Sequence, residues 1–143
     1  GGKLGPLAAP MEDLAALWDY VLVEADGSRG LPLKAHASYE PVVPSCAGLT
    51  ILVAGCSGLD RPIREAVHRP EVFCRLTGRS PEDAASPEAV AAALRAEGLG
   101  DLVFLNQADS PARRAAGLEL ARDLDRPAFI GALKGKEWTS CAS

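Results

Sequence analysis

The sequence lacks the features of a zinc protein, a disulfide scaffold or a nucleic-acid-binding protein. Its four cysteines stand far apart without a C-x-x-C pair, and only two histidines are present, so the close ligand pairs of a zinc site are missing. Lysine and arginine total 15 against 19 acidic residues, with no block of basic residues of the kind that binds nucleic acid. We therefore expect reduced thiols, no structural zinc and no nucleic-acid partner.

Long apolar runs and leader patterns are missing as well. No apolar run reaches the roughly 18 residues that a membrane helix needs, and no signal-peptide pattern opens the chain. These absences predict a cytoplasmic protein without a membrane partner. With 143 residues, 48% of them hydrophobic and 24% charged, the chain has the composition of one globular domain over residues 1–143. Because it opens on Gly1 and the loop-like GGKLGPLAAP, we interpret it as a fragment of a longer protein.

The hydrophobic pattern that is present predicts an α/β fold. Short apolar runs at residues 20–24, 49–54, 101–106 and 128–131 predict strands. Helical spacing lies between them at residues 11–17, 62–68, 71–76, 89–96 and from Ser110 to about residue 124, with Ser86 and Ser110 as N-caps ahead of prolines. Strands that alternate with helices indicate a mostly parallel sheet, flanked by helices on both faces.

Polar residues follow the first and the third predicted strands. EADG occupies residues 24–27 and NQAD occupies residues 106–109. In open parallel sheets, ligands bind outside the carboxyl ends of the strands. We therefore expect the two motifs to meet at one rim of the sheet.

The EADG motif has the residues of a metal and phosphate site. Asp26 or Glu24 could hold Mg²⁺ through water, which makes both candidate catalytic and metal-binding residues. Gly27 would let a backbone N–H approach a phosphate. The alternative is that Asp26-Gly27 is an ordinary turn and Glu24 a solvated strand end.

Two cations follow this motif in a long irregular segment, residues 27–48. Arg29 and Lys34 could balance phosphate charge near Asp26, or they could simply be solvated. Glu40 is expected to hold the segment by an ion pair with Lys34. A loop of this length in a compact domain is usually functional.

The NQAD motif resembles the N-K-x-D element with which many GTPases read guanine. The Asp109 carboxylate would accept hydrogen bonds from the base, and Asn106 would brace the loop and reach the base edge. Gln107 stands where that element has lysine. Alternatively, Asp109-Ser110 only begins a helix.

A phosphate-binding loop is missing from the 143 residues. No G-x-x-x-x-G-K-[ST] motif occurs, and Gly1-Gly2-Lys3 is interpreted as a linker. A nucleotide site built from EADG and NQAD therefore needs a phosphate-binding element from outside this sequence.

Four stretches in order resemble one protein family. They are WDYVLVEADGSRGLPLKA, YEPVVP, VHRPEVFCRLTG and VFLNQAD, and the resemblance runs from about Lys3 to Leu133. The family is the YqeC-type accessory proteins of selenium-dependent molybdenum hydroxylases. It usually has Pro in place of His36, His in place of Tyr39 and Lys in place of Gln107, and the last difference bears on the preference for guanine.

The resemblance implies a P-loop NTPase-like fold, incomplete here because family members carry their phosphate loop about a hundred residues before EADG. It also implies a role in maturing molybdenum hydroxylases of the xanthine dehydrogenase kind. Our leading hypothesis is a nucleotide-dependent accessory protein that binds GTP or ATP with Mg²⁺. It would be an NTPase only when an upstream phosphate loop is present.

Two other hypotheses remain open. One is a non-catalytic scaffold that holds a client molybdenum hydroxylase or the molybdenum cofactor, and the other is a domain whose polar loops are only loops. Among the remaining side chains, Trp18 and Trp138 are expected to pack in the interior. Cys56 is interpreted as a packed thiol rather than a carrier of selenium or sulfur.

Overall fold

The main sheet of the computed structural model has four strands in the order β2-β4-β5-β6. The model describes residues 10–141, so the predicted linker Gly1-Gly2-Lys3 lies outside the described residues. The strands are β2 (Ile51–Gly55), β4 (Leu102–Asn106), β5 (Ala128–Ala132) and β6 (Glu137–Ser140). The first three are parallel, and β6 is antiparallel to β5. The prediction of an α/β protein with a mostly parallel sheet is confirmed.

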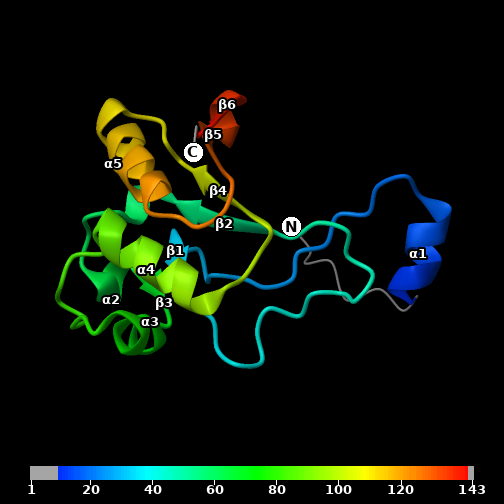
Figure 1. Ribbon diagram of the computed structural model, residues 1–143, viewed down its shortest axis with the longest axis horizontal. Helices are drawn as coiled ribbons and strands as arrows, with labels where there is room; N and C mark the ends of the chain where they lie inside the picture. The colour runs from blue at the N-terminus through cyan, green and yellow to red at the C-terminus, as the bar shows by residue number, and fades with distance from the viewer. Residues whose placement is uncertain (1–9, 142–143) are drawn as a thin grey trace.

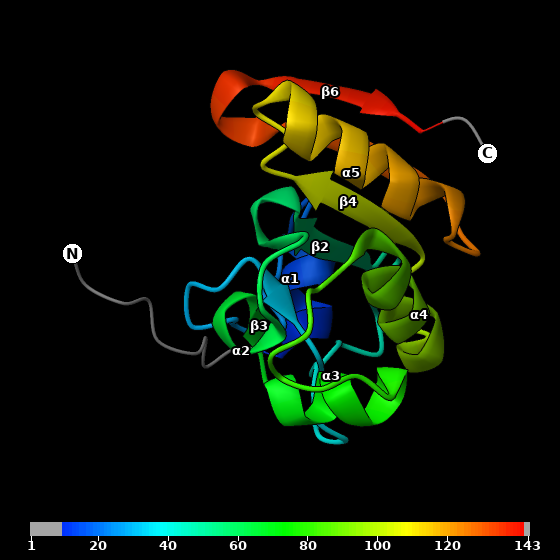
Figure 2. The ribbon, with the colours of Figure 1, turned by 90° about the vertical axis from the view of Figure 1, so that its left-hand side faces the viewer.

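Two long helices pack on one face of this sheet (Figure 2). They are α4 (Pro87–Glu97) and α5 (Pro111–Arg122). Each begins where the sequence predicts, because the hydroxyl of Ser86 accepts from the Ala89 N–H and that of Ser110 from the Arg113 N–H. The core between helices and sheet is apolar, with Val103, Leu105, Ile130, Val90, Leu94 and Leu120 all buried.

Shorter elements connect and flank the main sheet (Figure 1). They are α1 (Met11–Leu17), the 3₁₀ turn η1 (Cys56–Gly58), α2 (Ile63–Ala66), α3 (Pro70–Thr77) and the 3₁₀ turn η2 (Leu133–Gly135). Helix α1 buries none of its residues and lies apart from the rest in the figure. No helix among residues 10–141 is long and apolar enough to cross a membrane.

A second sheet of two short strands pairs β1 (Leu33–Lys34) with β3 (Val67–His68) in parallel. The helix predicted over residues 62–68 is therefore too long, because it ends at Ala66. Val67 is β-branched and buried, and pairing with Leu33 gives its backbone partners that a helix end would lack. This small sheet holds the segment after Gly27 against the main domain.

The opposite face of the main sheet is open among the described residues, which corrects the prediction of helices on both faces. Ile51 and Val53 on β2 point away from α4 and α5, and they remain 50% and 59% exposed. Val53 pairs in register with Phe104 on β4, which pairs with Phe129 on β5, and both phenylalanines are half-buried. Strand β2 is also an edge of this sheet, because among the described strands it pairs only with β4 in the main sheet.

The strand predicted over residues 20–24 is wrong for the described structure. These residues follow α1 as an extended, unpaired segment, with Tyr20 90% and Leu22 97% exposed. Apolar alternation and β-branched residues set a preference for extended backbone, but a strand also needs a neighbour with which to exchange hydrogen bonds. Residues 20–24 therefore have extended backbone but no neighbouring strand to pair with.

Candidate functional site

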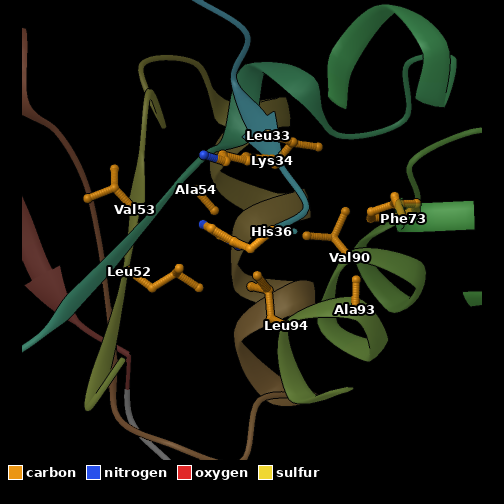
Figure 3. Close-up of a pocket in the computed structure, with 10 residues that line it drawn as sticks. All are labelled: Leu33, Lys34, His36, Leu52, Val53, Ala54, Phe73, Val90, Ala93 and Leu94. Carbon is orange, nitrogen blue, oxygen red and sulfur yellow. The ribbon is translucent and has the colours of Figure 1, made fainter. Parts of the chain in front are cut away.

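The Asp26 carboxylate lies between the nearly buried side chains of Lys34 and His36. Its Oδ2 atom is 2.7 Å from Lys34 Nζ and 3.0 Å from His36 Nε2. Figure 3 shows the Lys34 and His36 side chains pointing toward β2, above an apolar floor that includes Leu52, Ala54 and Leu94. The side chains of Lys34 and His36 are only 7% and 8% exposed. Asp26 therefore supplies the negative charge that the nearly buried Lys34 ammonium needs, and it is a hydrogen-bond partner for His36.

The far side of His36 is held by the last residue of α4. Glu97 Oε2 is 2.9 Å from His36 Nδ1, and Oε1 accepts the His36 backbone N–H at 2.6 Å. The Glu97 side chain is 6% exposed. The two ring nitrogens of His36 therefore face one carboxylate each, Asp26 at Nε2 and Glu97 at Nδ1.

A third carboxylate ties the other end of the segment to α3. Glu40 is 3.1 Å from Lys34 Nζ, as the sequence predicts, and it also accepts from Arg69 Nε and Nη2 at 3.0 and 2.9 Å. The hydrogen bond from Arg69 is the main reason that the pKa of Glu40 falls from 4.5 to about 2. We call Asp26, Lys34, His36, Glu40, Arg69 and Glu97 the charged clamp.

The other EADG candidates lie around the clamp without joining it. The carbonyl of Gly27 accepts from Lys34 Nζ at 3.1 Å. Glu24 is exposed, and it has no ion pair with another residue of the range 10–141. Arg29 is exposed at a positive φ of 54° in the turn that precedes β1. Lys34 is thus a structural partner of Asp26, while Glu24 and Arg29 remain free for a ligand within the described part.

The NQAD motif lines a different and much more open hollow at the carboxyl ends of β4 and β5. Its cavity volume is about 970 Å³. The walls are the loop 106–110, the start of α5, η2 and the first residues of β6. Side chains in the wall include the cations Arg113, Arg114 and Lys134 and the aromatic ring of Trp138. This is the position that ligands occupy in open parallel sheets.

Asn106 joins the two walls of the hollow. Its Oδ1 accepts from the Gln107 N–H at 2.8 Å and from the Leu133 N–H at 3.2 Å. The Ala108 N–H donates to the Gly131 carbonyl at 3.0 Å, so the loop is fastened to β5 at a second point. Asn106 thus braces the loop as expected, whereas its contact with a base stays a prediction.

Asp109 stands exposed at the entrance of α5. Its Oδ1 is 2.6 Å from Arg113 Nη1, one turn further along the helix. The hydrogen bond from Arg113 lowers the pKa of Asp109, so the carboxylate is charged at neutral pH. Asp109 and Arg113 are both about half exposed.

Gly55 connects the two regions through the backbone. Its N–H donates to the Pro32 carbonyl at 2.8 Å. A Cβ at Gly55 would collide with Pro32 on one side and with the Gln107 side chain on the other. Gln107, which stands where the N-K-x-D element has lysine, is itself hydrogen-bonded to the Ser57 hydroxyl. Pro32, in the segment that follows Asp26, and Gln107, in the NQAD loop, therefore both pack closely against Gly55.

Asp26 and Asp109 nevertheless do not line one cavity. The residues around the hollow include Asp109 but none of residues 24–34. The clamp reaches Glu97, which precedes the amino end of β4, whereas Asp109 follows the carboxyl end of that strand. The unpaired segment 20–24 explains the difference, since a strand there was expected to carry Asp26 to the common rim.

The remaining sequence candidates divide between packing and exposure. Cys56 is buried, and burial raises the pKa of its thiol to about 11, which fits the packed thiol that the sequence indicates. All four cysteines are free thiols. The prediction for the tryptophans is wrong, because Trp18 is 67% and Trp138 is 61% exposed. Within the described range, no group of three or more His, Cys, Asp or Glu side chains is arranged so that it could hold a metal ion.

Sequence reasoning missed several residues that build the two regions. His36 and Glu97 meet across 61 positions of the chain, and nothing in the local pattern of either residue indicates the contact. The sequence also gives no sign of the pair between Arg69 and Glu40 or of the turn η2. Arg69-Pro70 indicates only a helix start, and in the structure Arg69 is the N-cap of α3 at a positive φ of 64°.

The fold and these two regions define an α/β protein with polar loops at the ends of a parallel sheet. A family model described as YqeC protein matches residues 1–71, and through this match the chain belongs to the YqeC family. An Escherichia coli (strain K12) protein described as "Uncharacterized protein YqeC" is 43% identical over 65 residues, which are 45% of this chain. The match spans 25% of that relative's length. No solved structure matches the chain.

Proposed function

We propose that this chain carries the base-binding part of a nucleotide-dependent accessory protein that acts in the maturation of selenium-dependent molybdenum hydroxylases. The observation that carries the proposal is the hollow formed where Asn106 holds the NQAD loop against η2. The role in hydroxylase maturation rests on membership in the YqeC family. The nucleotide would be GTP or ATP, and the complete protein would have a P-loop NTPase-like fold.

The base would enter the hollow, and its N–H donors would donate to Asp109. Asn106 uses Oδ1 to brace the loop, which leaves its amide N–H₂ to donate to the base. Both walls are held by backbone hydrogen bonds, so little ordering is needed when the base binds.

Mg²⁺ and the phosphates would bind outside the hollow, on the side of Asp26, so the nucleotide would have to extend past Gly55, where the two regions approach each other. Lys34 and His36 share Oδ2, and Oδ1 makes no hydrogen bond with other residues in the range 10–141. One free carboxylate oxygen suits Mg²⁺, which commonly takes one or two carboxylates and completes its shell with water and phosphate. The neighbouring Lys34 and His36 reduce the local negative charge, so the phosphates must contribute to the attraction. When bound, the ion would neutralise phosphate charge.

The chain's own groups would then position the nucleotide. Gly27 presents backbone without a side chain, and a Cβ there would meet no atom within 4 Å. Arg29 and Glu24 are free to turn toward phosphate and metal-bound water. Hydrolysis is expected only when a phosphate-binding loop is supplied, because phosphoryl transfer depends on positioning and charge stabilisation.

The test is calorimetric titration of GTP and ATP with Mg²⁺ into this chain and into a form extended upstream in its reading frame. We expect binding to the extended form, weakened at least tenfold by Asp109→Asn, because a hydrogen bond to a charged group is lost. Asp125→Asn is the matched control, since Asp125 is equally exposed but pairs with Arg126 away from the hollow. Absence of binding to both forms at millimolar nucleotide would refute the proposal.

One observation favours a second candidate, a scaffold that holds a client hydroxylase without turning over nucleotide. The open face of the sheet, with Ile51 and Val53 half exposed, is the kind of apolar surface that protein partners cover. The two candidates differ in a co-sedimentation measurement with purified client enzyme. A scaffold binds equally well with and without nucleotide, whereas the leading proposal requires nucleotide to change the affinity.

A further inference from the structure

The carboxylate of Asp109 already accepts a hydrogen bond from a donor of the kind that a base would provide. Arg113 Nη1 donates to Asp109 Oδ1 at 2.6 Å, and both residues line the hollow. The loop that carries Asp109 is fixed at Asn106 and Ala108. A base can therefore reach this carboxylate by displacing one exposed side chain, with no change in the backbone.

The chemistry of the arginine identifies the class of base. A guanidinium presents N–H donors from neighbouring nitrogens on one carbon, and it pairs with a carboxylate through them. Guanine presents the same arrangement on one edge, where a ring N–H and an exocyclic N–H₂ are bonded to a common carbon. Adenine places a ring acceptor beside its amine on the corresponding edge. That acceptor would face the carboxylate oxygen without a proton between them.

We propose that Arg113 is an internal competitor that occupies the guanine-binding carboxylate of this hollow, and that the hollow selects guanine over adenine. The inference rests on the proposed function, because it assumes that a base binds at Asp109. Beyond the proposed function, it names guanine as the base and Arg113 as a residue that sets the affinity of the hollow for that base. Gln107 does not enter this selection, since its side chain is engaged by Ser57 at the base of the loop.

The competition is expected to be weak but measurable. The pair joins positions i and i+4 of the chain, and its side chains are 44% and 55% exposed. Exposed pairs of this kind contribute little, so removing the arginine should raise the affinity for guanosine by about twofold to fivefold. The adjacent residue offers a matched control. Arg114 also lines the hollow, but it is not bonded to Asp109 in the described structure.

The experiment uses nucleosides, so that charge attraction between phosphates and the cations of the wall does not mask the contribution of the base. Guanosine, inosine and adenosine are titrated into the chain, Arg113→Ala and Arg114→Ala. Binding is followed by the NMR signal of the Trp138 indole N–H, with Trp18, which follows α1 and does not line the hollow, as internal reference. Inosine lacks the exocyclic amine, so it should bind about tenfold more weakly than guanosine. Adenosine should bind no more tightly than inosine.

The supporting result is tighter guanosine binding in Arg113→Ala alone, with adenosine unchanged in every variant. Equal gains for guanosine and adenosine would overturn the selection, and equal gains in the two arginine variants would overturn the specific competition. If the unmodified chain binds guanosine and Arg113→Ala binds it equally, only this inference fails. If no nucleoside shifts the Trp138 signal in any variant at millimolar concentration, the base site of the proposed function fails with it.

Discussion

Asp26 and Asp109 follow similar apolar runs in the sequence, yet their carboxylates lie in opposite kinds of environment. Asp26 is fixed between Lys34 and His36, inside a clamp whose members are mostly buried. Asp109 stands at the edge of an open hollow with one exposed partner, Arg113. The first carboxylate is needed to neutralise the nearly buried Lys34, and the second can exchange its partner at little cost in stability. The charged clamp is therefore structural first, whereas the hollow is available for a ligand.

The largest effect is expected from Glu97→Ala, which tests whether the charged clamp stabilises the fold. The Glu97 side chain is 6% exposed, and its two oxygens are the partners of the His36 backbone N–H and of His36 Nδ1. The change removes both partners. We expect a loss of about 2–3 kcal/mol in the free energy of unfolding, because the backbone N–H and Nδ1 of His36 are left without these partners. The measurement is chemical denaturation followed by circular dichroism.

The matched control for that change is Glu119→Ala, an exposed glutamate in the middle of α5. Its removal should alter the free energy of unfolding by less than about 0.5 kcal/mol. Similar losses in the two variants would mean that the charged clamp does not stabilise the fold as described.

The next largest effect on the free energy of unfolding is expected from a direct comparison of Asp26 and Asp109. Asp26→Asn removes the charge shared by Lys34 and His36 and should lower the free energy of unfolding by about 1–2 kcal/mol. Asp109→Asn breaks only an exposed pair and should change it by less than about 0.5 kcal/mol. Thermal and denaturant unfolding of both variants provide the measurement. A larger loss for Asp109→Asn would reverse the roles assigned to the two regions.

The smallest effect is a pH dependence that belongs to Glu40. Because its pKa is about 2 in the folded chain and ordinarily 4.5, the unfolded chain takes up a proton first as the pH falls. Glu40 therefore contributes stability above pH 4.5, and this contribution is lost as the pH falls toward 2. The difference in unfolding free energy between the chain and Glu40→Gln should shrink over that range. A difference that stays constant down to pH 2.5 would contradict the role of Arg69 as its partner.

Much of the main domain was predictable from local pattern. The apolar runs at 49–54, 101–106 and 128–131 became β2, β4 and β5 with shifts of one or two residues at their ends. Ser86 and Ser110 cap α4 and α5 because a side-chain oxygen ahead of a proline can accept the free N–H groups of the first turn. The pair of Lys34 with Glu40 was also foreseen, since the two are close in sequence.

The sequence by itself determined which stretches prefer helix or strand and which loops carry charge, because these properties depend on neighbours within a few residues. Only the tertiary structure decided that Glu97 meets His36 and that residues 20–24 stay unpaired. It also decided that Arg113 and η2 enclose the NQAD loop in one hollow. Such contacts join residues far apart in the chain, so they depend on which surfaces pack together and on which backbone groups find a partner.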